Sequence, residues 1–361
     1  MRSQTLHRAF TLIELLVVIA IIALVIAIVV PTLGGVRDAA RSTGTRQILN
    51  EVSQAISAFE NDNRKLPGYF DERLMGADNV NTQGMSSLEN LMLDLMAAEI
   101  STASTAPGTG GTWIQVGPGT ADGVSRVWLN LDTLGTSSGN TRAYYTPAAK
   151  NFVAQTSPVQ QVGQAGNTAP EGAPQMPDLI DMWGQPILAW KQDAVTQGQI
   201  TQANQFAAAS APNAPSGQGA RFYWRSNAAF LSSSALGRRG VDQRYSNDKG
   251  SMIGEGVAAN QMAESLTAFL GHPSFPIRPA TGNPTLPSQA RGGIVLHSAG
   301  SDGVYLGKKD AGARQFDAGG PMLYARSFAN STGQLHTDKN GKTTTIDVVD
   351  DFDDEVIAVG N

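Results

Sequence analysis

The sequence has no cysteine and only four histidines in 361 residues. The lack of cysteine excludes disulfide bonds and thiol chemistry. The histidines, at positions 7, 272, 297 and 336, form no H-E-x-x-H spacing, and neither a P-loop nor a dinucleotide-binding fingerprint occurs. No constellation of residues therefore points to an enzyme.

Charge is also scarce, since Asp, Glu, Lys and Arg make up 16% of the chain and the formal net charge is -5. A mildly acidic protein has no electrostatic reason to bind nucleic acid, so we expect no nucleic-acid partner. The 39 glycines and 18 prolines predict many loops.

One long apolar run extends from Phe10 to Val30, and Pro31 follows it. Only Thr11 and Glu14 are polar among its 21 residues. As a helix this run is roughly 30 Å long, which matches the hydrocarbon core of a bilayer. We therefore expect a single transmembrane helix over residues 10–30. Because a carboxylate in an apolar helix costs on the order of 3 kcal/mol, Glu14 indicates either a functional pairing or a side chain that snorkels to the membrane surface.

The nine residues before this run carry Arg2 and Arg8 and end in the small residue Ala9. The positive-inside rule places this leader in the cytoplasm, so that most of the chain is exported. A secretory signal would instead have its small-residue cleavage site after the apolar region. Loss of the two arginines with the leader would change the formal net charge from -5 to -7.

The segment from Arg8 to Leu15, RAFTLIEL, resembles the N-terminus of the type IV pilin-like proteins, as do the apolar run and Pro31. This family includes pilins and the pseudopilins of type II secretion. The resemblance implies that a prepilin peptidase cleaves between Ala9 and Phe10 and methylates the new amino group of Phe10. It also implies that Glu14 is the residue that directs assembly. The family usually has Gly where this chain has Ala9.

Beyond Pro31, apolar residues recur at three- and four-residue steps from Val36 to Phe59, with charged residues between them. This spacing predicts that the helix continues to residue 63 as an amphipathic segment that packs on a globular domain. Pro31 removes one helical hydrogen bond, so we predict a kink there. The expected organisation is therefore a leader (1–9), a transmembrane helix (10–30), the exported half of the same helix (31–63) and a periplasmic domain (64–361).

The expected domain is α+β, with the long helix packed on an antiparallel sheet in a pilin-like arrangement. A short helix is predicted over 86–100, where Ser86 and Glu89 fit a capping box. Another helix is predicted over 257–270, and strands over 186–191, 221–225 and 293–297. Three stretches rich in small and polar residues are expected to be large loop insertions, namely 101–123, 155–177 and 196–219.

Two short segments extend the resemblance toward the major pseudopilin of type II secretion. They are Asp181 to Pro186, a D-x-W-G-x-P pattern, and Ser298 to Gly303, which follows a predicted strand. The resemblance implies a structural calcium ion held by Asp302 and by carboxylates of the acidic tail, Asp353 and Asp354 among them. Clustered carboxylates can supply the oxygen ligands that calcium requires. A solvated acidic terminus is the alternative for this tail.

Three functions follow from these features. The first is a pseudopilin-like subunit that waits in the bacterial inner membrane, joins other pseudopilin subunits through an assembly platform, and forms a periplasm-spanning filament for protein export. Its partners would be the prepilin peptidase, other copies or related subunits, and membrane lipid. The second is a low-copy minor pilin or tip protein that binds cargo or an adhesion target. The third is a membrane-tethered enzyme, which no constellation of catalytic residues supports. We interpret the neighbouring His297 and Ser298 as the end of a strand rather than as part of a catalytic triad.

Overall fold

The computed structural model describes most of the long helix and the ordered part of the domain that follows it. The described residues are 12–76, 85–119, 123–136, 142–154, 176–193, 207–208, 221–222, 227, 269–270, 276–277, 286–287, 290–301, 303, 305 and 354–360. Within α1, the side chains of residues 28–33 are outside this description.

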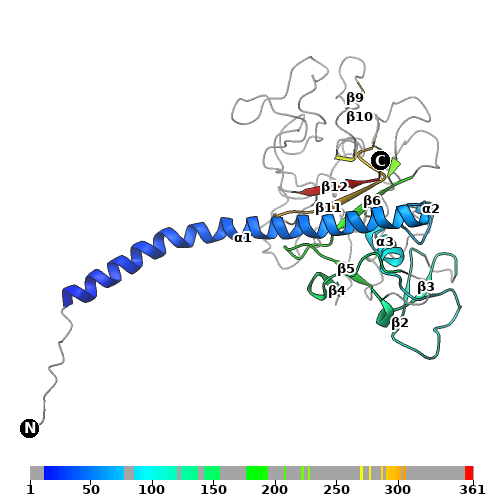
Figure 1. The fold of residues 1–361 in the computed structure, drawn as a ribbon, viewed down its shortest axis with the longest axis horizontal. Helices are drawn as coiled ribbons and strands as arrows, with labels where there is room; N and C mark the ends of the chain where they lie inside the picture. The colour runs from blue at the N-terminus through cyan, green and yellow to red at the C-terminus, as the bar shows by residue number, and fades with distance from the viewer. Residues whose placement is uncertain are drawn as a thin grey trace, which may run out of the picture.

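The described fold is mixed α+β, with one long N-terminal helix and antiparallel sheets (Figure 1). The helices are α1 Leu12–Asn63, α2 Glu72–Gly76 and α3 Ser87–Leu95, with short 3-10 turns η1 Leu131–Thr133 and η2 Ala149–Asn151. The strands are β1 Ile100–Ser101, β2 Trp113–Val116, β3 Val127–Asn130, β4 Phe152–Ala154, β5 Pro177–Leu179, β6 Leu188–Asp193, β7 Ala207–Ala208, β8 Arg221–Phe222, β9 Pro276–Ile277, β10 Leu286–Pro287, β11 Ile294–Ser298 and β12 Glu355–Val359.

The main sheet has five antiparallel strands in the order β12-β11-β6-β8-β7. Its centre is β11, in which Leu296 lies opposite Ala189 of β6 and Ile357 of β12. All five residues of β11 are buried, as expected for a short apolar strand covered on both faces. The remaining described strands form a three-stranded sheet, β1-β3-β2, and two pairs, β4-β5 and β9-β10.

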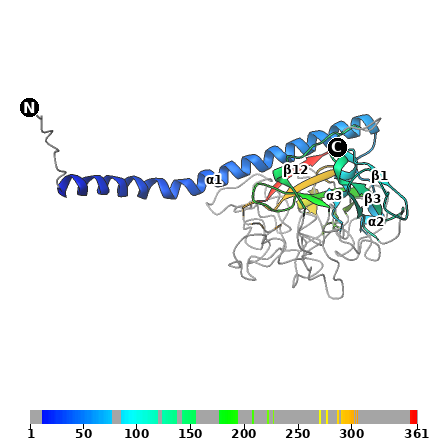
Figure 2. The ribbon, with the colours of Figure 1, turned by 90° about the horizontal axis from the view of Figure 1, so that it is seen from below.

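Helix α1 has two parts with different surroundings. From Leu12 to Arg41 every described side chain is exposed, whereas Thr45 and a stripe of apolar residues after it are buried. The stripe consists of Ile48, Leu49, Val52, Ala55, Ile56 and Phe59. The helix is continuous through Pro31, and Figure 2 shows that its free part runs at an angle to its packed part. The kink at Pro31 itself stays a prediction.

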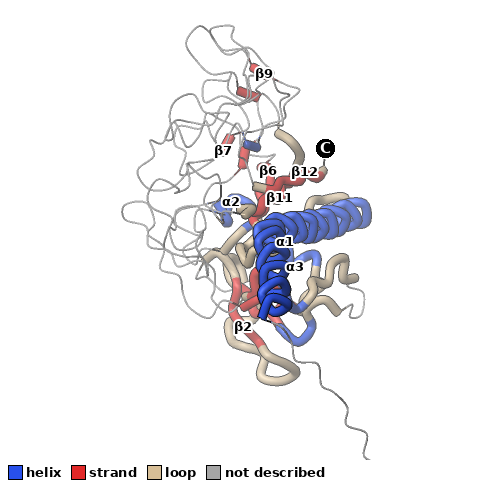
Figure 3. Tube along the Cα trace, turned by 90° about the vertical axis from the view of Figure 1, so that its left-hand side faces the viewer, coloured by secondary structure: helices blue, strands red, loops and turns tan. Residues whose placement is uncertain are grey.

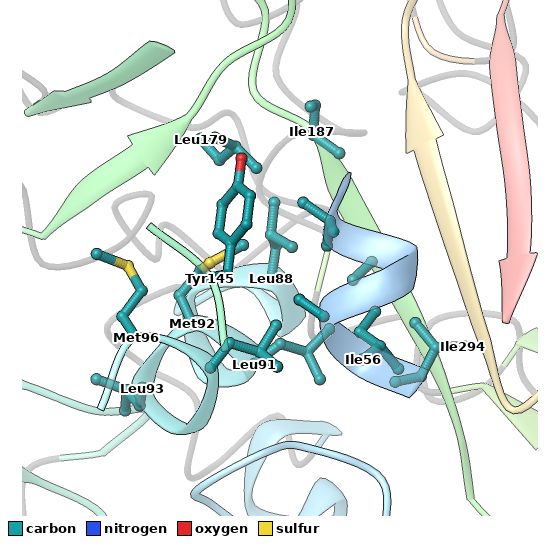
Figure 4. Close-up of a cluster of buried hydrophobic side chains, with 14 of the residues drawn as sticks. Ile56, Leu88, Leu91, Met92, Leu93, Met96, Tyr145, Leu179, Ile187 and Ile294 are labelled. Atoms are coloured by element: carbon teal, nitrogen blue, oxygen red, sulfur yellow. The ribbon is translucent and has the colours of Figure 1, made fainter. Parts of the chain in front are cut away.

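The hydrophobic core lies between α1, α3 and the sheets. α1 contacts β11, β12 and α3, while α3 also contacts β5 and β6. Figure 3 shows the two helices beside the red strands of the main sheet, and Figure 4 shows Ile56 of α1 and Ile294 of β11 in the same cluster as the apolar side chains of α3. Ile294 and Leu296 of β11 belong to this core. Because successive strand residues point to opposite faces, Ser298 lies on the same face as these two residues and His297 lies on the other.

Several local predictions are confirmed. The helix predicted over 86–100 is confirmed in part as α3, which ends at Leu95, whereas Ile100 begins β1. Its capping box is present, since Glu89 N donates to Ser86 Oγ and Ser86 N donates to a Glu89 carboxylate oxygen. The strands predicted at 186–191, 221–225 and 293–297 correspond to β6, β8 and β11.

Other predictions fail or lie elsewhere. The loop predicted over 101–123 is wrong in part, because it contains the end of β1 and all of β2. The alternating Trp113 and Gln115 pair with β3 there, a local pattern that the surrounding glycines and threonines conceal. The insertions at 155–177 and 196–219 and the helix at 257–270 lie almost wholly outside the described residues.

The two parts of α1 should respond very differently when an apolar side chain is replaced by alanine. Replacing the fully buried Ile56 by Ala should lower the free energy of unfolding by roughly 2–5 kcal/mol, because it removes apolar contacts and leaves a cavity. The matched change Val36→Ala, at an exposed position of the same helix, should have almost no effect. Denaturant unfolding of the full chain in detergent measures both. Equal losses of unfolding free energy in the two variants would contradict the conclusion that only the second part of α1 packs on the domain.

Candidate functional site

The N-terminal half of α1 presents an unusual surface. Its apolar side chains are exposed from Leu12, at 81%, to Ile26, at 54%, and Val36 further along is 64% exposed. Monomeric soluble proteins rarely expose a continuous apolar surface of this kind, and such surfaces mark contacts with protein or lipid. This half therefore requires an apolar partner that the described part of the domain does not provide.

Within the part of the chain that the structure describes, no helix is both long enough and apolar enough to cross a membrane. That part leaves out Phe10, Thr11 and the side chains of 28–33, which all fall in or next to the expected span of 10–30.

Glu14 lies in the first turn of α1 and is exposed. The first backbone N–H groups of a helix have no intrahelical acceptors, so a carboxylate is favoured in this turn. Ala9 and Phe10, the predicted cleavage residues, lie outside the described residues. Glu14 thus lies near the start of the described helix, four residues along the chain from the predicted new N-terminus.

The domain contacts α1 through polar groups at a junction, which consists of Ser42, Gly44, Thr45 and Arg46 of the helix. The carboxylate of Glu355, at the start of β12, accepts a hydrogen bond from Ser42 Oγ and lies 3.5 Å from Arg46 Nε. On the same stretch of helix, Thr45 Oγ1 accepts a hydrogen bond of 3.2 Å from the backbone N–H of Met182.

Gly44 permits the closest approach at this junction. A Cβ atom at residue 44 would lie 2.8 Å from Cγ of Met182, which is too close for an ordinary contact. Glycine therefore lets the loop that contains Met182 rest directly on the helix backbone.

That loop is the D-x-W-G-x-P segment, and its residue types explain its shape. Oδ1 of Asp181 accepts hydrogen bonds from the backbone N–H groups of Trp183, at 2.8 Å, and Gln185, at 2.9 Å. Gly184 has a φ of +85°, a conformation that side chains disfavour. Asp181 thus closes the turn with its side chain, and Gly184 allows the chain to reverse.

The same carboxylate joins this loop to the end of β11. Ser298 Oγ donates a hydrogen bond of 2.7 Å to Asp181 Oδ2, across a separation of 117 residues, and the pair is buried. Burial raises the pKa of Asp181 to about 6, although the hydrogen bonds from Ser298, Gln185, Trp183 and Gly184 act in the opposite direction.

On the opposite face of the sheet, His297 is fully buried between Asp354 and Trp190. Its Nε2 lies 2.9 Å from Asp354 Oδ2, and Trp190 Nε1 lies 3.5 Å from its Nδ1. Because an indole N–H can only donate, Nδ1 must accept, so the ring proton sits on Nε2 and points at Asp354. Burial among the rings of Phe269 and Tyr305 lowers the pKa of His297 to about 3, which keeps this ring neutral.

His297 and Ser298 therefore have separate partners on opposite faces of β11. This geometry does not bring the hydroxyl and the imidazole together as a nucleophile and base.

The predicted calcium ligands are only partly visible. Asp302 and Asp353 lie outside the described residues, and Asp354 faces His297 at hydrogen-bonding distance. Among the described residues, no group of three or more acidic, histidine or cysteine side chains could hold a metal ion. Calcium binding stays a prediction.

The alternative of a solvated acidic terminus is wrong for the last two residues of the acidic run. Asp354 and Glu355 are both 7% exposed, and each is engaged on a different face of the sheet. One signal in the sequence could have predicted that these two carboxylates begin a buried strand. It is the apolar pattern of Val356, Ile357 and Val359 directly after the acidic run.

Comparison with known protein families matches residues 5–30 to the prokaryotic N-terminal methylation motif. The prepilin signal of type IV pilin-like proteins is therefore present, and it covers the predicted cleavage site, Glu14 and the apolar run. No curated protein and no solved structure matches the chain.

The buried Asp181 predicts a specific pH dependence. Its pKa is about 6 in the folded state and 3.8 when solvated, so the folded state binds the extra proton between these values and wild-type stability falls as the pH rises from about 4 to about 6. In Asp181→Asn the amide oxygen still accepts from Trp183 and Gln185, and the amide NH₂ donates to Ser298. The variant should gain up to about 3 kcal/mol over the wild type across this range.

Unfolding free energies of the two proteins, measured from pH 4 to pH 7, give this difference directly. Other titrating groups, His297 included, are the same in both proteins and cancel. A difference that stays constant with pH would contradict the raised pKa.

Proposed function

We propose that this chain is a structural subunit of a type IV pilin-like filament, stored in the bacterial inner membrane before assembly. The observation that supports this best is the match of residues 5–30 to the methylation motif, combined with a helix that continues from that motif into the domain. Processing by a prepilin peptidase and assembly with other pilin-type subunits are what the motif implies.

The exposed half of α1 supports the storage step. Its apolar side chains suit the hydrocarbon of a bilayer before assembly and the helices of neighbouring subunits afterwards. Both surroundings exclude water, so the same surface serves in the membrane and in the filament. The packed half keeps the domain outside this apolar region.

Glu14 supports the assembly step. Cleavage before Phe10 would create a charged amino group only four residues from this carboxylate along the chain. Where water is excluded, opposite charges attract strongly. A neighbouring subunit that supplies its amino group would pair with Glu14 and set the register between the two helices.

Within the family, we favour a pseudopilin of the type II secretion kind. Support comes from the hydrogen bond between Asp181 and Ser298, because it joins the two segments whose sequences resemble the major pseudopilin. A structural calcium ion near Asp302 and the acidic tail belongs to the same proposal. Asp354, whose Oδ2 faces His297, has at most one further oxygen to contribute.

A low-copy tip or surface protein is the second candidate. It is favoured by the long segments of low complexity at 155–177 and 196–219, which would add bulk to every subunit of a tightly packed fibre. The number of copies separates the two functions. A purified fibre made mostly of this chain supports the filament subunit, whereas a few copies per fibre support the tip protein.

The mature N-terminus tests membership of the family. Mass spectrometry of the protein from membranes should find a chain that begins with N-methylated Phe10 and lacks residues 1–9. The same protein from cells without the prepilin peptidase should retain the leader. An intact leader in the presence of the peptidase would reject the proposal.

Glu14 tests the assembly mechanism. Glu14→Ala should insert and fold normally but reduce filament assembly at least tenfold, because the amino group of the incoming subunit loses its partner. Shearing and sedimentation of filaments measure the assembled fraction, and cross-linking between subunits reports on their contact. Glu51→Ala removes a carboxylate from the exposed surface of the same helix within the domain and should assemble normally. Normal filaments from Glu14→Ala would contradict the mechanism.

A further inference from the structure

Two exposed arginines lie on α1 just before the part of the helix that packs on the domain. Among the described residues, Arg37 and Arg41 form no ion pair or hydrogen bond through their guanidinium groups. Two other arginines do have partners, since Arg46 lies 3.5 Å from Glu355 and Arg142 lies 3.0 Å from Asp62. We call Arg37 and Arg41 the basic collar.

The collar lies between the apolar run and the domain. Arg37 and Arg41 are one helical turn apart and so share a face of α1. At 1.5 Å per residue, they lie roughly 10 and 16 Å beyond Val30, whereas the first buried residue, Thr45, lies roughly 22 Å beyond it. The stretch of helix between Val30 and Thr45 is therefore longer than the headgroup layer is thick, since that layer measures roughly 5–8 Å on each side of a bilayer.

The direction of the side chains brings the charges closer to the membrane. Side chains on a helix lean toward its N-terminus, and for α1 this is the direction of the apolar run. Long arginine side chains extend their charged ends to the interface while their stems lie along the helix. The guanidinium group of Arg37 can therefore reach the depth of lipid phosphates when residues 10–30 span the bilayer. That of Arg41 lies one helical turn further out, roughly 6 Å, where it still attracts anionic headgroups because this distance is shorter than the Debye length.

We propose that the basic collar binds the phosphates of anionic lipids on the exported side of the membrane and holds the stored subunit at a fixed height. This inference rests on the proposed membrane anchoring. Guanidinium groups suit phosphate because they donate several hydrogen bonds in a planar fork. The whole chain carries a formal charge of -5, so the collar offers this surface an attraction that the acidic domain cannot. Asp38, also exposed, reduces that attraction without reversing it.

The test uses the full-length chain reconstituted into phosphatidylcholine vesicles that contain a minority of phosphatidylglycerol. Electron spin resonance of spin-labelled lipids measures how strongly each lipid associates with the protein. Wild type should prefer phosphatidylglycerol, and Arg37→Gln with Arg41→Gln should reduce that preference about fivefold or more, since each charge near an anionic surface contributes about 1 kcal/mol. High salt should weaken the wild-type preference in the same way.

The controls separate the collar from other charges. Arg64→Gln with Lys150→Gln removes two exposed charges from the domain and should leave the preference unchanged. Arg2 and Arg8 of the leader are present in every variant, so their contribution cancels. Equal preferences in wild type and in the collar variant would overturn the proposal, as would an equal loss in the control variant.

Vesicle flotation distinguishes this inference from the function on which it rests. Protein that does not float with vesicles would contradict membrane anchoring itself. Protein that floats but shows no preference dependent on the collar would contradict only the lipid contact. If the collar variant keeps its lipid preference but no longer forms filaments, the two charges act between subunits, and the lipid proposal is wrong.

Discussion

The whole structure depends on one helix that must satisfy two different surroundings. The first half of α1 exposes apolar side chains along its length, and the second half buries an apolar stripe against β11, β12 and α3. Neither half can exchange its surroundings with the other, because the second half carries charged and polar residues on its outer face, whereas Glu14 is the one charged residue of the apolar run in the first half. The domain therefore begins to cover α1 at Ser42 to Thr45, where the helix side chains are no longer all exposed.

Three kinds of contact hold that position. Gly44 removes bulk so that the Met182 loop can approach, Thr45 accepts a backbone hydrogen bond from this loop, and Glu355 engages Ser42 and Arg46. The loop is itself held through Asp181 and Ser298. The junction is thus connected to the centre of the main sheet through a short chain of buried polar contacts, and such contacts are specific because an unsatisfied partner would be costly.

The sequence predicted elements whose signals are local. The apolar run and amphipathic pattern predicted α1, Ser86 and Glu89 predicted the start of α3, and β-branched residues predicted β11. It could not predict which side chains meet, because Asp181 and Ser298 are 117 residues apart and His297 and Asp354 are 57 apart. The acidic run before β12 concealed a strand for a related reason, since its last two carboxylates are buried by contacts with distant residues rather than by their own neighbours.

The pairing of β12 with β11 and α1 has a consequence for the order of folding. Along the chain β12 follows every other described strand, while α1, which it contacts, precedes them all. Closing such a long loop is slow compared with forming local structure. Until β12 is made, the stripe of α1 and one edge of β11 therefore lack this partner. If the N-terminal half is anchored in a membrane, as we propose, the anchor would keep these surfaces on one chain apart from those on others.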